Sequence, residues 1–343
     1  MKVDQLILIL MLATGLLCSC QKEIDLAIMS VDTPTTEQAS VPLEIVWSNS
    51  DELSLGKLSY EFASNVRYGN HKRNKFDIAT PNSETPTPLV IYIHGGGFTM
   101  GDKKAAYIHS DTIRKFLANN IAFATINYRY LDQSEDGVLS CLQDCKNFLQ
   151  FARYYADELN VDPERIATYG PSAGGGAGLW LATSDDLADM GSEDLLQRQS
   201  TRLSAAVALG TQSTYDMVRW EEIFAPYNFM LADTMFDQQT LFDFYSINDL
   251  EQLYQPKTTD YRASVDMLRL MDAQDAPIYV QNFGKALPPK ETVDLYHHPY
   301  HAHALKERAT AVGLPHLITS YKTGITDERD QGPVQFLLEQ FGK

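Results

Sequence analysis

The sequence has little positive charge. Its 343 residues include 28 Lys and Arg against 45 Asp and Glu, which gives a formal net charge of −17 at pH 7. Nucleic-acid binding depends on basic side chains that neutralise phosphates, so this balance argues against a nucleic-acid partner. Hydrophobic residues still make up 44% of the chain, which is enough to bury a core. We expect a globular protein in an open aqueous compartment.

Cysteine is also scarce, with four residues in the whole chain. A protein of this length needs no disulfide framework. Cys141 and Cys145 are four positions apart in a predicted helix, where the Cβ atoms lie about 5–6 Å apart. A disulfide needs roughly 3.5–4.5 Å. We therefore expect two free, packed thiols.

The most apolar run, LILILMLATGLL, is too short to span a bilayer comfortably. It follows Met1 and Lys2 and ends at small residues, which is typical of a secretory signal peptide. The segment LLCSC that closes it resembles the bacterial lipobox, whose last cysteine is lipidated and becomes the new N-terminus. We expect residues 1–19 to be a lipoprotein signal peptide and Cys20 to carry the lipid. The alternative is an ordinary signal peptide with incidental cysteines.

Charged residues follow Cys20 closely, at Lys22, Glu23 and Asp25. They are similar to the segment that sends lipoproteins of Bacteroidetes to the cell surface. We expect a protein of the bacterial cell envelope, lipid-anchored in the outer membrane or at the cell surface, that meets the membrane only through its anchor. Residues 20–65 are polar and acidic, which predicts a tether and N-terminal lead-in.

Residues 66–343 alternate between strand-length apolar runs and helix-length amphipathic stretches. The runs are PLVIYIHGG, IAFATINYRY, RIATYGPS, SAAVALG, APIYVQNFG and LITSYK. Helices are predicted near 105–119, near 138–159, from 173, over about 300–312, and in GPVQFLLEQFG. This alternation predicts an α/β domain with a mostly parallel sheet flanked by helices.

A helical insertion is predicted at about 215–275, between SAAVALG and APIYVQNFG. The stretch is rich in aromatic residues and Met at roughly helical spacing. Such a stripe packs a helical segment against a sheet. An insertion at the carboxyl edge of such a sheet also forms the wall of a binding pocket. The segment can serve as packing, as a cap over a site, or as both.

Ser172 lies in GPSAG, a Gly-x-Ser-x-Gly pentapeptide. The predicted strand RIATYG runs directly into it, and small residues open a helix after it. This is the strand-to-helix turn that exposes a nucleophilic hydroxyl. The flanking glycines are required because side chains there would collide with the neighbouring strand and helix.

A glycine run, His94-Gly95-Gly96-Gly97-Phe98, follows the earlier strand PLVIYI. Backbone N–H groups in such a run can point at a developing oxyanion that side chains would obstruct. A glycine-rich turn without that role is the alternative, and we favour the oxyanion hole.

HGGGF, NYRY at 127–130 and GPSAGG at 170–175 together resemble the α/β-hydrolase superfamily, in its hormone-sensitive-lipase-like and carbohydrate-esterase-like branches. The resemblance covers residues 66–343. It implies that Ser172 is the nucleophile and that the amides of Gly96, Gly97 and Ala173 form the oxyanion hole. It also implies loop-organising or structural roles for His94, Tyr128 and Arg129, and no cofactor.

The resemblance further implies an acid after the seventh strand and a histidine after the eighth, and here the pattern breaks. The segment after LITSYK contains Asp327, Glu328 and Asp330 but no histidine. Carboxylates with a pKa near ~4 are poor bases for a serine hydroxyl. His316 precedes that strand, at the wrong end of the sheet.

The remaining candidates for the base are His297, His298, His301 and His303, which follow Asp294 after the seventh strand. We choose His298, because it precedes Pro299 where the chain should still be extended, and Asp294 as the carboxylate that orients it. The alternatives are a solvated loop carboxylate and a histidine-rich helix start on the surface. His297 and His301 would share a face if the helix began early, but no further ligand is evident and we expect no metal.

Two functions remain open at this stage. One is a serine ester hydrolase with a displaced base, acting on small-molecule or carbohydrate esters such as the acetyl or feruloyl groups of polysaccharides. The other is a non-catalytic protein of the same fold that binds a ligand in the pocket. The elbow serine and the glycine loop favour the enzyme, and the missing histidine favours the binder.

Overall fold

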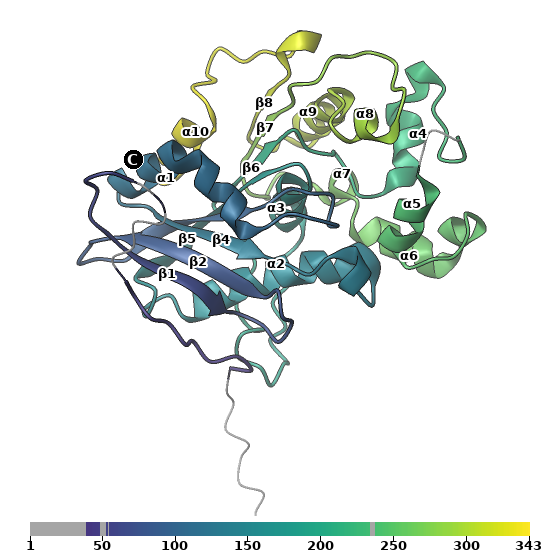
Figure 1. Cartoon of the computed structure of the whole chain (residues 1–343). Coiled ribbons are helices and arrows are strands. Elements are labelled where there is room, and N and C mark those ends of the chain that lie inside the picture. The colour runs from purple at the N-terminus through teal and green to yellow at the C-terminus, as the bar shows by residue number, and fades with distance from the viewer. Residues whose placement is uncertain (1–38, 49–52, 54, 234–236) are drawn as a thin grey trace, which may run out of the picture. The chain divides into compact units, whose positions relative to one another are not determined.

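One eight-stranded sheet organises the computed structural model of the chain, which describes residues 39–48, 53, 55–233 and 237–343 (Figure 1). The strands are β1 Tyr60–Arg67, β2 Lys75–Pro81, β3 Thr87–Ile93, β4 Ala122–Asn127, β5 Val161–Pro171, β6 Ala205–Leu209, β7 Ile278–Gln281 and β8 His316–Thr319. Their order across the sheet is β1-β2-β4-β3-β5-β6-β7-β8. β2 is antiparallel to β1 and β4, and the other neighbours are parallel. The predicted mostly parallel α/β fold is confirmed.

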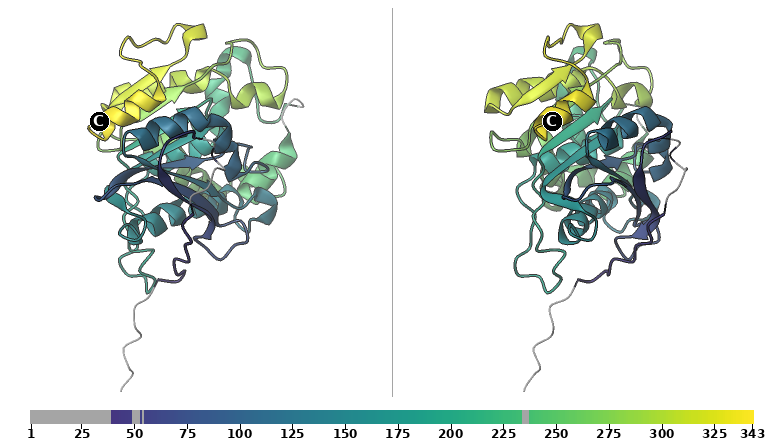
Figure 2. Two further views of the ribbon diagram at one scale, coloured as in Figure 1. Left: turned by 60° about the vertical axis from the view of Figure 1, so that its left-hand side comes forward. Right: turned by 90° about the vertical axis from the view of Figure 1, so that its left-hand side faces the viewer.

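Helices cover both faces of this sheet, as the two further views in Figure 2 show. They are α1 Ser110–Ala118, α2 Gly137–Tyr154, α3 Ala173–Thr183, α4 Trp220–Ile223, α5 Gln238–Tyr245, α6 Pro256–Ser264, α7 Met267–Leu270, α8 Thr292–Tyr296, α9 Tyr300–Val312 and α10 Pro333–Gln340. Short 3₁₀ helices are η1 Lys103–His109, η2 Leu131–Gln133, η3 Met217–Arg219, η4 Ala225–Tyr227, η5 Glu251–Tyr254 and η6 Tyr321–Thr323.

The core lies on both sides of the sheet because successive strand residues point to opposite faces. On one face Val90, Tyr92 and Val207 pack with the apolar sides of α1 and α10, which lie side by side in Figure 1. On the other face Ile91 and Ala206 belong to a cluster that includes α2, α3 and α9. β3 and β4 are buried along their whole length, which explains their unbroken apolar sequences.

Between β6 and β7 the chain forms the short helices η3 to α7, in the segment whose spacing predicts a helical insertion. Two ion pairs hold this segment together. Arg262 Nε lies 2.8 Å from Asp216 Oδ1, and Arg219 Nη1 lies 2.8 Å from Asp266 Oδ2. The hydroxyl of Thr214, just after β6, donates to Asp266 Oδ1. The insertion is therefore tied to the carboxyl edge of the sheet.

The N-terminal part of the domain differs from the sequence expectation. β1 and β2 are antiparallel strands that the sequence analysis does not predict, and β1 begins at Tyr60, within the stretch expected to be lead-in. Val41 is buried in the core, and Ser40 Oγ donates to Asp194 Oδ2 at 2.6 Å. The described residues from 39 onward thus pack on the domain.

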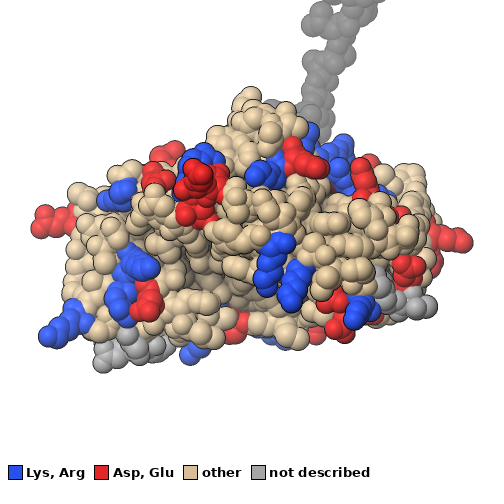
Figure 3. Space-filling model, turned by 90° about the horizontal axis from the view of Figure 1, so that it is seen from above, with Lys and Arg blue, Asp and Glu red and all other residues tan. Residues whose placement is uncertain are grey.

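Cys141 and Cys145 lie in α2, where both thiols are buried and free, as the helical spacing predicts. On the face drawn in Figure 3, acidic and basic side chains are interspersed. Within the described ranges, no helix has the length and apolar character needed to cross a bilayer. The predicted signal peptide at 1–19 and the lipidation site Cys20 lie outside the described residues.

Candidate active site

Ser172 occupies a tight turn between β5 and α3. Its φ is 50° and its ψ is −124°, a strained conformation for a residue with a side chain. The turn is possible because a Cβ on Gly174 would overlap the Ile93 carbonyl oxygen, and a Cβ on Gly170 would lie 2.6 Å from the same atom. The Ser172 amide donates to Leu209 O at 2.8 Å. The structure therefore has the strand-to-helix elbow that the pentapeptide predicts.

Gly96, Gly97 and Ala173 line the same pocket as Ser172. Gly96 has a φ of 115° and Gly97 a φ of 60°, the region that favours glycine. A Cβ on Gly96 would collide with the Met100 carbonyl. Among the described residues, no group accepts a hydrogen bond from the amides of Gly96 or Gly97. Ala173 begins α3, so its amide belongs to the first turn, where N–H groups have no partner within the helix.

His94 lies behind this glycine loop and faces away from solvent. Its Nδ1 donates to Gly95 O at 2.7 Å, and its ring stacks on Tyr128 with centroids 4.3 Å apart. The Tyr128 hydroxyl donates to His94 O at 2.8 Å, while Arg73 donates to Gly101 O at 3.1 Å. Burial lowers the pKa of His94 to about 4, which keeps the ring neutral. These contacts suit the loop-organising role of His94 and the structural role of Tyr128 that the resemblance implies.

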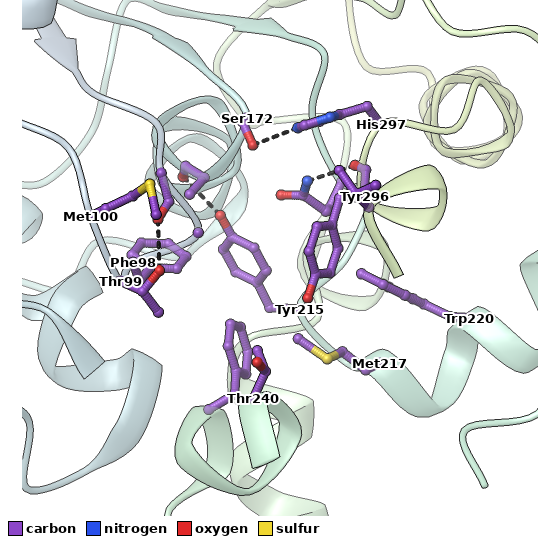
Figure 4. A pocket seen from close by; sticks show the side chains of 16 residues that line it. Phe98, Thr99, Met100, Ser172, Tyr215, Met217, Trp220, Thr240, Tyr296 and His297 are labelled. Atoms are coloured by element: carbon purple, nitrogen blue, oxygen red, sulfur yellow. Dashed lines mark hydrogen bonds between the residues drawn. The ribbon is translucent and has the colours of Figure 1, made fainter. Parts of the chain in front are cut away.

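The imidazole beside Ser172 belongs to His297. Its Nε2 lies 2.8 Å from Ser172 Oγ (Figure 4). His297 follows α8 directly as the C-cap residue and carries an exposed side chain. The surrounding protein desolvates the ring and lowers the pKa of His297, with no carboxylate acting to raise it. Within the described ranges, the site thus holds a serine–histidine pair without a carboxylate on the imidazole.

His298, the base that the sequence analysis selects, does not reach Ser172. It is buried, its Nε2 donates to Leu287 O at 3.2 Å, and its Nδ1 accepts from the Tyr300 amide at 3.1 Å. Its ring packs against Phe224. His298 lies between the end of α8 at Tyr296 and the start of α9 at Tyr300, and its side chain turns into the core instead of toward Ser172. The structure replaces His298 with His297 at this position.

Asp294 does not orient an imidazole either. Its carboxylate accepts from the amides of Lys290 and Glu291 and forms a capping box with Glu291 at the start of α8. Burial lowers the pKa of His298, and the charge of Asp294 opposes that shift only in part. Asp294 does not act on the pKa of His297. The expected aspartate–histidine pair is therefore corrected to a helix cap.

The other two histidines of the cluster also point elsewhere. His301 is buried against Trp220, its Nδ1 lies 3.0 Å from Ser213 Oγ, and its Nε2 donates to Leu295 O at 3.0 Å. Burial lowers its pKa to about 3. His303 lines a separate cavity on the far side of α4. Within the described residues, no group of three or more His, Cys, Asp or Glu is placed to hold a metal ion.

The carboxylates after β8 have other partners. Asp330 accepts from the hydroxyls of Tyr279 and Tyr321 at 3.0 and 2.7 Å. Asp327 pairs with Arg329, which lowers the pKa of Asp327 to about 2. His316, at the start of β8, donates to Leu314 O. This segment supplies no base to Ser172.

A cavity of about 510 Å³ opens beside the serine–histidine pair. Its wall is mostly aromatic and methionine side chains, contributed by the glycine loop, the insertion and α8. They are Phe98, Met100, Tyr215, Met217, Trp220, Phe244 and Tyr296. The buried Tyr215 hydroxyl donates to Ala173 O at 2.8 Å, which ties the insertion to the first turn of α3. The insertion therefore packs on the sheet and also forms the pocket wall.

The sequence of the chain is similar to those of known proteins. The sequence model of the BD-FAE family matches residues 76–300. An arylesterase of Saccharolobus solfataricus is 34% identical over 98 residues, 29% of this chain and 31% of that protein. The chain thus aligns with about a third of the length of that curated relative.

Solved structures match over more of the chain. A truncated carbohydrate esterase from gut microbiota has a TM-score of 0.62 at 18% identity, covering 84% of this chain and 99% of that one. An acetyl ester-xyloside bifunctional hydrolase from Caldicellulosiruptor lactoaceticus has a TM-score of 0.51 at 16% identity, covering 81% and 85%. At such identities the likeness shows the fold alone.

Proposed function

The chain belongs to the BD-FAE family of α/β-hydrolase esterases, and on that premise we propose that it is a serine carboxylesterase with Ser172 as nucleophile and His297 as base. The observation that carries the proposal is the 2.8 Å contact between Ser172 Oγ and His297 Nε2. Two further features support it. The hydroxyl is presented on a strained turn, and the backbone amides of Gly96 and Gly97 are free of other partners among the described residues.

The reaction begins when Ser172 Oγ attacks the ester carbonyl carbon and His297 Nε2 takes the hydroxyl proton. The carbonyl oxygen becomes an oxyanion, which the amides of Gly96, Gly97 and Ala173 stabilise. The C–O bond to the alcohol then breaks, and His297 returns its proton to the departing oxygen. In the second half, water attacks the acyl-serine carbonyl carbon and gives a proton to His297. The bond from that carbon to Ser172 Oγ then breaks and His297 returns the proton to Oγ, which releases the carboxylic acid and free Ser172.

The missing acid changes the electrostatics of this scheme. In a complete triad the carboxylate stabilises the imidazolium and fixes the tautomer that leaves the other nitrogen free. Partial desolvation by the surrounding protein instead lowers the pKa of His297, so the ring is neutral and able to accept a proton around neutral pH. The cost is a weaker base, because a lower pKa makes proton abstraction less favourable.

Acyl groups on polysaccharides, such as acetyl or feruloyl esters, are the substrates we propose. A cavity of about 510 Å³ with aromatic walls has room for an acyl group of either size. Two proteins of the same fold are described as a carbohydrate esterase and as an acetyl ester-xyloside hydrolase, which supports this class.

Substitution of the nucleophile tests the proposal. Ser172→Ala should lower kcat for an aryl acetate by about 10⁴ or more and abolish labelling by a fluorophosphonate. Ser184→Ala is the matched control, because this buried serine lies just after α3 and its hydroxyl donates to Trp180 O, away from the site. It should keep both activities. If the purified wild type neither hydrolyses aryl acetates nor reacts with the probe, the ligand-binding alternative replaces the enzyme.

For localisation, we propose that the mature protein is anchored in the cell envelope through a lipid on Cys20. The LLCSC segment supports this proposal. Cys20→Ala should release or mislocalise the protein, because it removes the residue that carries the lipid. Stable anchoring needs more than one acyl chain, so no weaker contact should replace it. Cys18→Ala is the control, because Cys18 lies within the segment that is removed. If Cys20→Ala still partitions with membranes and its mature N-terminus carries no lipid by mass spectrometry, the anchor is not at Cys20.

A further inference from the structure

The peptide carbonyls on both sides of His297 are held by carboxamide side chains. Gln212 Nε2 donates to the Tyr296 carbonyl at 2.6 Å, and Asn282 Nδ2 donates to the His298 carbonyl at 3.3 Å. His297 therefore lies between two fixed points of the backbone. We call Gln212 and Asn282 the carboxamide clamp.

Both members of the carboxamide clamp come from the carboxyl edge of the sheet. Gln212 follows β6 and Asn282 directly follows β7, and their side chains are 6% and 1% exposed. Thr211 joins them, because its amide donates to Asn282 Oδ1 and its carbonyl accepts from Asn282 Nδ2, each at 3.0 Å. A buried carboxamide with all these bonds has one orientation, so it can transmit the rigidity of the sheet to the loop.

The His297 ring itself has little to hold it. Its hydrogen bond within the described part of the chain is the one to Ser172 Oγ, and its Nδ1 has no partner there. The side chain is exposed, and no carboxylate fixes its tautomer. The placement of its Cα and Cβ by the backbone is therefore the main constraint on where Nε2 lies.

We propose that Gln212 and Asn282 are positioning residues for His297, which set through the backbone the ring placement that a triad carboxylate would set through the ring. This inference rests on the proposed esterase function. The clamp is uncharged, so it can fix geometry but cannot stabilise the imidazolium. A displacement of the reacting group by about 1 Å can lower the rate about 10²-fold.

The test compares Gln212→Met and Asn282→Leu, which remove the donors with little change in volume. Gln150→Met is the matched control, since the buried Gln150 Nε2 donates to two carbonyls, Gln197 O and Gln199 O, in another part of the fold. Gln212→Met should lower kcat for an aryl acetate about 10²-fold, with KM and the pH of the acidic limb unchanged. Gln150→Met should affect thermal stability but not kcat. If Asn282→Leu does not fold, the result for Gln212→Met alone tests the positioning role.

A double-mutant cycle shows whether the effect passes through His297. In a His297→Ala background, Gln212→Met should change the residual rate by less than about threefold, because no ring remains to be positioned. Gln212 also lines the pocket. A change in KM, or a full effect that persists in the His297→Ala background, would mean that Gln212 acts on substrate and would overturn the inference.

Fluorophosphonate titration separates misplacement from misfolding. In Gln212→Met the labelling endpoint should stay near one per chain while the labelling rate falls with kcat. A lower endpoint with a normal rate in the labelled fraction would indicate a merely structural role and overturn the inference. If Ser172→Ala abolishes activity and Gln212→Met keeps the wild-type kcat, the inference fails and the esterase proposal stands.

Discussion

Replacement of His297 by alanine is the most direct test of the serine–histidine pair. The change removes the ring whose Nε2 lies 2.8 Å from Ser172 Oγ. The side chain is exposed, so its loss leaves no buried cavity. Any fall in activity is therefore expected to come from the lost proton acceptor and not from unfolding.

The size of the loss follows from the absent carboxylate. In a serine protease with a complete triad, removal of the histidine costs about 2 × 10⁶ in kcat and removal of the aspartate about 3 × 10⁴. Their ratio, roughly 70, is the further loss in kcat when the histidine is removed from an enzyme that already lacks the aspartate. We take it as the smallest loss to expect for His297. We expect His297→Ala to lower kcat by about 10² or more, with the remainder supplied by the oxyanion hole.

The assay is the initial rate of aryl acetate hydrolysis, measured with thermal unfolding of the same samples. His298→Ala is the informative comparison, because His298 is the neighbouring imidazole and is buried against Phe224. It should lower the melting temperature, since it loses two hydrogen bonds and aromatic packing, while keeping most of kcat. A folded His297→Ala protein with a rate within threefold of wild type would refute the assignment, and a collapse of kcat in His298→Ala alone would restore the sequence-based choice.

Three further outcomes are expected. His297 must be neutral to accept a proton, and partial desolvation by the surrounding protein lowers its pKa. The value of kcat/KM should therefore persist as pH falls through 6.5 and be lost only below it, and a midpoint at or above 6.5 would contradict this. Gly96→Ala should lower kcat about 10²–10³-fold, because the new Cβ would collide with the Met100 carbonyl and displace the oxyanion loop; wild-type kcat would argue against that loop. Lys103→Met should destabilise the fold by about 3–5 kcal/mol in urea unfolding, because it removes the ammonium group that offsets the charge of the buried Asp77 at 2.7 Å. An unchanged urea midpoint would show that the ion pair is dispensable.

The elbow and the glycine loop are predictable from sequence because their chemistry is local. Only glycine fits beside Ser172 at positions 170 and 174, where a side chain would meet backbone atoms. The same holds at Gly96, whose φ of 115° excludes other residues. Apolar runs such as β3 and β4 are equally clear, since a strand buried on both faces must be apolar throughout.

The identity of the base could not be predicted in the same way. His297 and His298 are adjacent, and the turn that ends α8 points their side chains in different directions, one toward Ser172 and one toward Leu287 O. Which one faces Ser172 depends on where the five-residue helix α8 ends. One signal was present, because Glu291 and Asp294 have the spacing of a capping box. That spacing indicates a helix start before the histidines and a structural use for Asp294.

The antiparallel strands were missed for a related reason. β1 has a register shift between Ala63 and Val66, which breaks the alternation of buried and exposed residues that identifies a strand. β2 carries the buried Asp77, whose charge is offset by Lys103 from a distant part of the chain. A tertiary ion pair of this kind leaves no local pattern in the sequence.

The position of His297 before α9 also bears on which parts of the protein can open without stopping catalysis. β8 is the edge strand of the sheet, and it pairs with β7 alone. Edge elements exchange their amide hydrogens through local unfolding at a lower free energy than the centre. If the base followed β8, each fraying event would carry it away from Ser172. With the base joined instead to the carboxyl edge of β6 and β7, local unfolding of β8 can occur while His297 and Ser172 stay together.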